Sequence, residues 1–227
     1  MSKKGLLIGG ILLFPPVLFI LLSTGKTNFI RLGYFGTKTP HTITINGKEK
    51  TDTVYYSAPP FNGINQFGDS VSEKKFLGTI YIADFFYTNG GKNETALAAE
   101  MQRVQEQFKG YDSILFISFS IDPLRDSVSA LSAFAKKVHA NTKTWSFIRG
   151  DQQKMYALQK DGYLLSVKDS DGFSLSNKLV LVDKSKHIRG IYTGTSVTDV
   201  NRLIDETHVL IDEYFVHRKP KKNALDD

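Results

Sequence analysis

Residues 78–108 read GTIYIADFFYTNGGKNETALAAEMQRVQEQF, and the rest of the chain is organised around them. Residues 80–87 form a β-branched and aromatic run of strand length, bounded by turn residues. After the loop at residues 88–93, apolar side chains recur at the 3.6-residue period of a helix, at Leu97, Met101, Val104 and Phe108. The stretch therefore predicts a strand, a loop and a helix.

The chain after this helix continues to alternate strands and helices. Residues 113–120, 145–148 and 179–182 are apolar runs of strand length, and we expect the last to be a central strand covered on both faces. Residues 187–192 should pair with it as a hairpin. The predicted helices start at Asp126 or Ser127, at Asp151, and at a capping box formed by Ser196 with Asp199. This order predicts a mixed sheet with helices on both faces.

The region before the first core strand carries two turn signals. Residues 41–48 alternate and then turn at Asn46-Gly47, which predicts a small hairpin. Residues 58–71 read as an entry loop followed by a hairpin turn at residues 67–69.

The N-terminus predicts a membrane anchor. Lys3 and Lys4 precede an uncharged, leucine-rich run at residues 5–22, and a helix of about 18 residues spans roughly 27 Å, close to the hydrocarbon core of a bilayer. The alternative is a cleaved signal peptide, but the run exceeds its usual apolar length of about 7–15 residues and no small-x-small cleavage site follows. The lysines favour a cytoplasmic N-terminus, so residues 28 onward should face the periplasm of a bacterial inner membrane as the domain of a single-pass protein.

Composition excludes several functions. The chain of 227 residues contains no cysteine, which rules out disulfides, thiol redox catalysis, thiolate nucleophiles and sulfur-ligated zinc. The formal charge is +6, but the lysines are scattered and no basic helix appears, so we expect no nucleic-acid binding. The five histidines share no short spacing, and no serine–aspartate setting suggests a catalytic triad.

Several stretches together resemble the Sco/SenC family of thioredoxin-like, membrane-anchored copper chaperones of cytochrome c oxidase assembly. They are DFFYT at residues 84–88, FSIDPLRD at residues 119–126, RGD at residues 149–151 and KLVLVDKSKHIRGIYTG at residues 178–194. The resemblance runs from about Pro59 to Tyr214 and includes the N-terminal anchor. It implies an α/β, thioredoxin-like mixed central sheet flanked by helices, with one N-terminal transmembrane helix.

The copper ligands of that family are missing from this chain. The resemblance implies two cysteines in a C-x₃-C spacing, which fall here on Gly90 and Glu94, and a histidine that falls on or near Leu175. Glycine and leucine offer no ligand, and a carboxylate is a hard donor that suits soft Cu(I) poorly. Met101 and Met155 occupy apolar helix faces and do not suggest a relocated thioether site. We therefore expect no metal site, no cofactor and no catalytic residue.

The loop itself leaves alternatives open. Asn89, Gly90, Gly91 and Lys92 precede a helix and could form a small anion-binding nest, but a solvated turn is the simpler interpretation because no second phosphate-binding element is visible. Glu94 is best explained as a first-turn carboxylate that complements the helix dipole. Asp122 and Asp126 could be read as an acid–base pair, and helix capping with a strand-end turn explains them better.

The expected organisation is an anchor at residues 1–23, a linker with a short hairpin at 24–57, the thioredoxin-like domain at 58–217 and a basic tail at 218–227. We expect a non-enzymatic scaffold or accessory subunit of an envelope complex, with a respiratory oxidase as the candidate complex by analogy with the family. The alternative is a copper chaperone with a non-standard or partner-shared site. The expected partners are the membrane and membrane-protein subunits.

Overall fold

The computed structural model describes residues 14–16, 31–45, 48–165 and 175–216. Met1–Ile30 and Arg31–Asp227 are separate units. In the first unit, Phe14 to Pro16 are helical, and the rest of the predicted anchor at residues 5–22 lies outside the described residues, as does the basic tail. Within the described ranges, no helix combines the length and the apolar character that crossing a bilayer requires.

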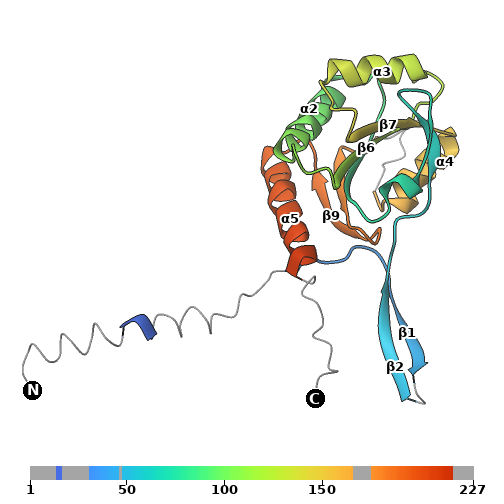
Figure 1. The fold of residues 1–227 in the computed structure, drawn as a ribbon. Coiled ribbons are helices and arrows are strands. Elements are labelled where there is room, and N and C mark those ends of the chain that lie inside the picture. The colour runs from blue at the N-terminus through green and yellow to red at the C-terminus, as the bar shows by residue number, and fades with distance from the viewer. Residues whose placement is uncertain (1–13, 17–30, 46–47, 166–174, 217–227) are drawn as a thin grey trace, which may run out of the picture. The chain divides into compact units, whose positions relative to one another are not determined.

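A seven-stranded mixed sheet forms the centre of the second unit, as the sequence predicts (Figure 1). Its spatial order is β4-β3-β7-β6-β5-β8-β9. Strands β5, β6 and β7 are parallel, whereas the other neighbouring pairs are antiparallel. The strands are β3 (Asn62–Asn65), β4 (Ser70–Ser72), β5 (Ile80–Phe86), β6 (Ile114–Ser120), β7 (Trp145–Arg149), β8 (Lys178–Val182) and β9 (Ile188–Thr193).

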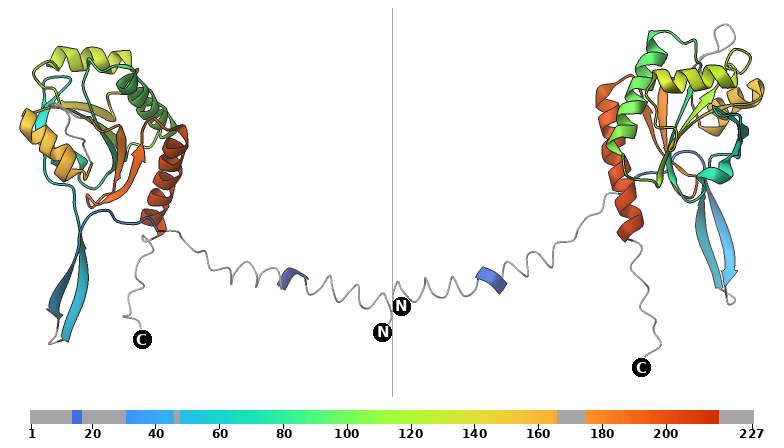
Figure 2. Two further views of the ribbon diagram at one scale, coloured as in Figure 1. Left: turned by 180° about the vertical axis from the view of Figure 1, so that it is seen from behind. Right: turned by 45° about the horizontal axis from the view of Figure 1, so that its top comes forward.

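Helices cover both faces of this sheet. On one face lie α2 (Lys92–Gln107), α3 (Val128–Lys137) and α5 (Val197–Val216), and the ribbon views show α2 beside α5 (Figures 1 and 2). On the other face lie the short helix η1 (Glu73–Phe76), α4 (Gln152–Ala157) and its π-helical continuation η2 (Leu158–Gly162). The predicted helical faces are the buried ones, since Leu97, Met101 and Val104 are at most 1% exposed.

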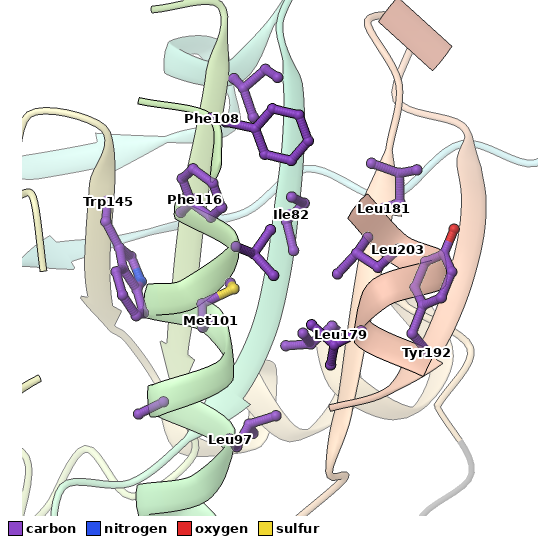
Figure 3. Close-up of a cluster of buried hydrophobic side chains, with 14 of the residues drawn as sticks. Ile82, Leu97, Met101, Phe108, Phe116, Trp145, Leu179, Leu181, Tyr192 and Leu203 are labelled. Carbon is purple, nitrogen blue, oxygen red and sulfur yellow. The ribbon is translucent and has the colours of Figure 1, made fainter. Parts of the chain in front are cut away.

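The core on the α2 side joins the central strands to two helices. Figure 3 shows Ile82 and Phe116 of the sheet facing the α2 side chains, with Leu179 and Leu181 of β8 beside Leu203 of α5. Burial of such side chains is the dominant favourable term in folding, at about 25 cal/mol per Å² of apolar surface. The run at residues 178–194 therefore anchors α5 to the sheet.

An additional two-stranded sheet stands apart from the main one (Figure 1). Strands β1 (Lys38–Ile45) and β2 (Lys48–Tyr55) pair antiparallel, from Lys38 with Tyr55 to Ile45 with Lys48. The predicted hairpin is therefore present but longer than residues 41–48. The sequence of β2, KEKTDTVY, lacks an apolar alternation, so its strand character comes from pairing with β1.

The structure refines three local predictions. Strand β8 is buried as expected, but it lies between β5 and β9, one strand from the edge of the sheet. Ser127, not Asp126, caps α3, because its hydroxyl accepts a hydrogen bond from Ala130 N at 3.2 Å. At the start of α5, Asp199 N donates to Ser196 Oγ, but the Asp199 carboxylate accepts from Thr193 N at 2.8 Å, so the box is only half formed.

Candidate functional site

The three positions that the family resemblance assigns to copper ligands lie at one end of the sheet. Gly90 and Glu94 follow the carboxyl end of β5, where the chain enters α2. Strand β8 runs antiparallel to β5, with Val180 opposite Ala83, so β8 begins where β5 ends. Leu175 lies three residues before the start of β8 and is half-buried against the core on the α4 side. The separation between Gly90 and Leu175 stays a prediction.

Glu94 fills the space beside Gly90. A Cβ atom added at Gly90 would clash with Cβ and Cγ of Glu94, and one added at Gly91 would lie 3.8 Å from Glu94 Oε2. Burial and the neighbouring Glu94 carboxylate raise the pKa of the Tyr87 hydroxyl. A carboxylate and a phenol, both hard oxygen groups, thus lie near each other at this loop. This donor set does not fit Cu(I), which prefers thiolates and thioethers.

Part of the backbone of the candidate binding loop already forms hydrogen bonds within the chain. Gly90 N donates to Tyr87 O at 3.2 Å, and Thr95 N donates to Gly91 O at 3.3 Å. Asn89, Gly91 and Lys92 are exposed, and Gly91 precedes α2 without a side-chain cap. Anion binding by residues 89–92 stays a prediction.

Asp126 holds this loop in place, a role that the sequence analysis missed. Its carboxylate is fully buried and accepts hydrogen bonds from Thr88 N at 3.0 Å, Thr88 Oγ1 at 2.5 Å and Ser120 Oγ at 2.5 Å. It therefore joins the loop after β5 to the end of β6. Asp122 has a separate partner, because it pairs with the guanidinium of Arg125 on the surface. Each carboxylate thus has a structural contact of its own.

A second buried carboxyl group lies within the sheet. Asp84 of β5 is opposite Ser118 of β6, and the Ser118 hydroxyl donates to Asp84 Oδ1 while accepting from Trp145 Nε1 at 2.8 Å. Burial raises the pKa of Asp84 from 3.8 to about 7. An aspartate in the middle of an otherwise apolar strand was the sequence signal for this group. It lies in the strand that leads to the candidate loop.

The described part of the chain offers no conventional metal centre. Among those residues, no three histidine or acidic side chains cluster closely enough to hold an ion. Met101 and Met155 are 0% and 2% exposed and belong to the two separate core clusters, as their predicted helix faces require. They cannot converge on one ion without unfolding a core.

These features define a thioredoxin-like α/β protein whose strand-to-helix loop carries no thiol. The SCO1/SenC family model matches residues 49–212, so the chain belongs to the SCO1/SenC family. A SCO1 protein homolog of Bacillus subtilis (strain 168) is 32% identical over 108 residues, which are 47% of this chain and 56% of that protein. The match thus spans little more than half of the length of that relative.

Solved structures agree with the family assignment. A SCO1/SenC family lipoprotein from Bacillus anthracis str. Ames is similar with a TM-score of 0.63 and 25% identity, over 69% of this chain and 95% of that one. BsSco, described as a member of the Sco family of cytochrome c oxidase assembly proteins, gives a TM-score of 0.61 and 26% identity, over 68% and 93%. BsSco is also described as having a disulfide switch. A disulfide requires two cysteines, and this chain has none.

Proposed function

We propose that this chain is a Sco-family protein that works without a metal or thiol redox site, as an accessory subunit or scaffold of an envelope complex. The observation that carries the proposal is the content of the strand-to-helix loop. The Glu94 side chain lies against Gly90 and its carboxylate influences the Tyr87 hydroxyl, where the family resemblance implies two thiolates. The Glu94 side chain occupies the space beside Gly90, and the loop offers no soft donor for copper.

The framework around the loop supports a retained binding role. Asp126 still ties the loop to β6 through three hydrogen bonds, and the core beneath it is closely packed. A protein that has lost its reactive residues can keep its fold and still bind a partner, because function depends on the particular side chains that a fold carries. We therefore place this protein among binding proteins rather than enzymes.

The proposed location is the outer side of a bacterial inner membrane. Lys3 and Lys4 before the apolar residues 5–22 support a single-pass anchor with the domain in the periplasm. A similar protein from Bacillus anthracis is described as a lipoprotein. Lipid attachment through cysteine is impossible here because the chain has no cysteine. The proposed helix would supply the membrane attachment instead.

The candidate partner is a respiratory oxidase, since BsSco is described as belonging to a family of cytochrome c oxidase assembly proteins. Affinity purification of the tagged full chain from detergent-solubilised membranes tests this. We expect oxidase subunits and haem absorbance to co-purify, and the same from Glu94→Gln. The control is the same tag on Met1–Ile30 alone, which should recover neither. Recovery of the full chain without oxidase subunits would contradict the oxidase assignment.

A further inference from the structure

A cavity on the opposite face of the sheet from α2 has no role in the function proposed above. Its volume is about 780 Å³, within the 300–1,000 Å³ typical of small-molecule sites. One wall is the segment before β3 together with η1, and the other is α4 with η2. None of Gly90, Glu94 and Leu175 lines it. It is therefore separate from the candidate loop.

The floor of this cavity is apolar and already formed. Phe61, Met155 and Leu158 line it and are 7%, 2% and 7% exposed. The Phe61 ring is fixed by edge contact with Phe119, with ring centroids 4.9 Å apart. Thioethers such as Met155 make favourable contacts with aromatic rings. A ring entering the cavity would gain these contacts without reorganising the protein.

The mouth of the cavity is polar but carries no net charge. Glu73 and Lys74 come from η1 on one wall, whereas Lys154 and Asp161 come from the other. The two lysines and two carboxylates cancel, so the mouth attracts neither anions nor cations strongly. It can nevertheless hydrogen-bond an uncharged polar group.

The second wall is held in an unusual conformation. Residues Leu158–Gly162 form a π-helical turn, a feature that is rare and frequent at functional sites. The Tyr56 hydroxyl donates to the carbonyl oxygens of Asp161 at 2.9 Å and Gly162 at 3.0 Å. These bonds fix the turn to the opposite wall and hold the cavity open at a defined width.

From the aromatic and thioether floor and the charge-balanced mouth, we infer that this cavity binds an uncharged, ring-bearing amphipathic small molecule. The ring packs on Phe61 and Met155, and the polar end stays at the mouth. A charged ligand is disfavoured because its charge would be partly desolvated without a net opposite charge nearby. This binding activity is independent of whether the chain carries copper or joins an oxidase.

Photolabelling with benzophenone, an uncharged two-ring ketone, tests the inference on the full chain in lipid nanodiscs. Irradiation inserts the probe into nearby C–H bonds, and peptide mass spectrometry locates the insertion. We expect saturable labelling at Met155 and Leu158 that excess diphenylmethane, which is not photoreactive, abolishes. The anionic analogue 4-benzoylbenzoate should label these residues at least about fivefold less, because its carboxylate resists burial. Absent or unsaturable labelling at these residues would overturn the inference, and equal labelling by the anion would overturn the ligand class.

A matched pair of variants gives a second test. Ala157 lines the cavity and is exposed, so Ala157→Trp should fill the mouth and reduce labelling about tenfold while the fold persists. Ala133, exposed on α3, provides the control Ala133→Trp, which should change nothing. Labelling elsewhere in the chain should stay constant in both variants. Unchanged labelling of Met155 in a folded Ala157→Trp chain would contradict the proposed site.

Discussion

The carboxylate of Asp126 accepts a hydrogen bond from the backbone N–H of Thr88 at 3.0 Å. This contact joins the loop that follows β5 to the turn that follows β6, and Asp126 is fully buried. The loop that would carry the family's chemistry is therefore held by a neighbouring turn and does not depend on a metal for its position.

Removing this carboxylate should destabilise the chain. Asp126→Ala leaves three donors of Thr88 and Ser120 without their acceptor, and we expect it to lower the free energy of unfolding by about 3 kcal/mol. Urea titration followed by the fluorescence of the single tryptophan measures this. The control Asp122→Ala breaks a pair whose arginine is 68% exposed and should cost less than about 1 kcal/mol. Similar costs for both variants would refute the anchoring role.

Asp84 should make stability depend on pH. Its pKa is about 7 in the folded chain and near 3.8 when unfolded, so between these values only the folded state keeps the proton. Its contribution is complete below the unfolded pKa and is lost as pH rises to about 7, at up to roughly 1.4 kcal/mol per pH unit. Asp84→Asn keeps an acceptor for Ser118 and cannot ionise, so unfolding midpoints from pH 4 to 7 should show a flatter dependence. An unchanged slope would contradict this.

Arg189 should be a large single contributor to stability. It is buried and donates to Asp183 at 3.1 Å, to Glu213 at 2.8 Å and to the carbonyl oxygens of Leu32 and Gly33. Arg189→Met removes the cation between two carboxylates and should cost about 3–5 kcal/mol. Hydrogen exchange should also accelerate at Leu32 N, which donates to Glu213.

Arg202 is the matched control for this variant. It also pairs with two carboxylates, Asp199 and Glu206, but it is 47% exposed. Arg202→Met should therefore cost less than about 1 kcal/mol. If both variants unfold at the same urea concentration, burial does not increase the contribution of the Arg189 contacts to the free energy of unfolding.

The parts of the fold in which apolar residues recur at a regular spacing were predictable. The apolar run leading to Phe86 and the helical spacing from Leu97 to Val104 define β5 and α2, since periodicity directly reports which face is buried. Turn chemistry likewise located the hairpin at Phe67, which lies between β3 and β4. These features depend on neighbours in sequence, so a single sequence contains them.

Features that depend on distant contacts were missed. Strand β2 is polar, and only pairing with β1 reveals it. Asp126 looked like a helix cap because caps and buried anchors use the same residue type, and the distinction requires knowing where Thr88 lies. Arg189 reaches Leu32 across much of the chain, and no local pattern marks that contact. At the candidate site, the assignment of residues to the ligand positions stays a prediction, whereas the influence of Glu94 on Tyr87 became visible only in the structure.

The family correspondence can be tested by rebuilding the site. In the triple variant Gly90→Cys, Glu94→Cys and Leu175→His, the shorter side chain at position 94 removes the Glu94 Cγ from the space beside Gly90, and a small shift of the loop has to relieve the remaining contact between the two Cβ atoms. Two thiolates at a helix N-terminus and an imidazole suit Cu(I), and the helix dipole lowers the thiol pKa. We expect uptake of one Cu(I) per chain and ready oxidation to a disulfide. A folded triple variant that takes up no Cu(I) would show that the three positions do not converge.

The central claim is that the chain carries no copper site, and competition for Cu(I) tests it most directly. The purified full chain is titrated under reducing conditions into a Cu(I) complex of a chromophoric chelator, and the chelator absorbance reports any transfer of copper. We predict that the absorbance stays constant through several equivalents of protein, because residues 87–94 contain no thiol or thioether for Cu(I). Stoichiometric removal of one Cu(I) per folded chain would contradict the account and favour a copper chaperone with a non-standard site.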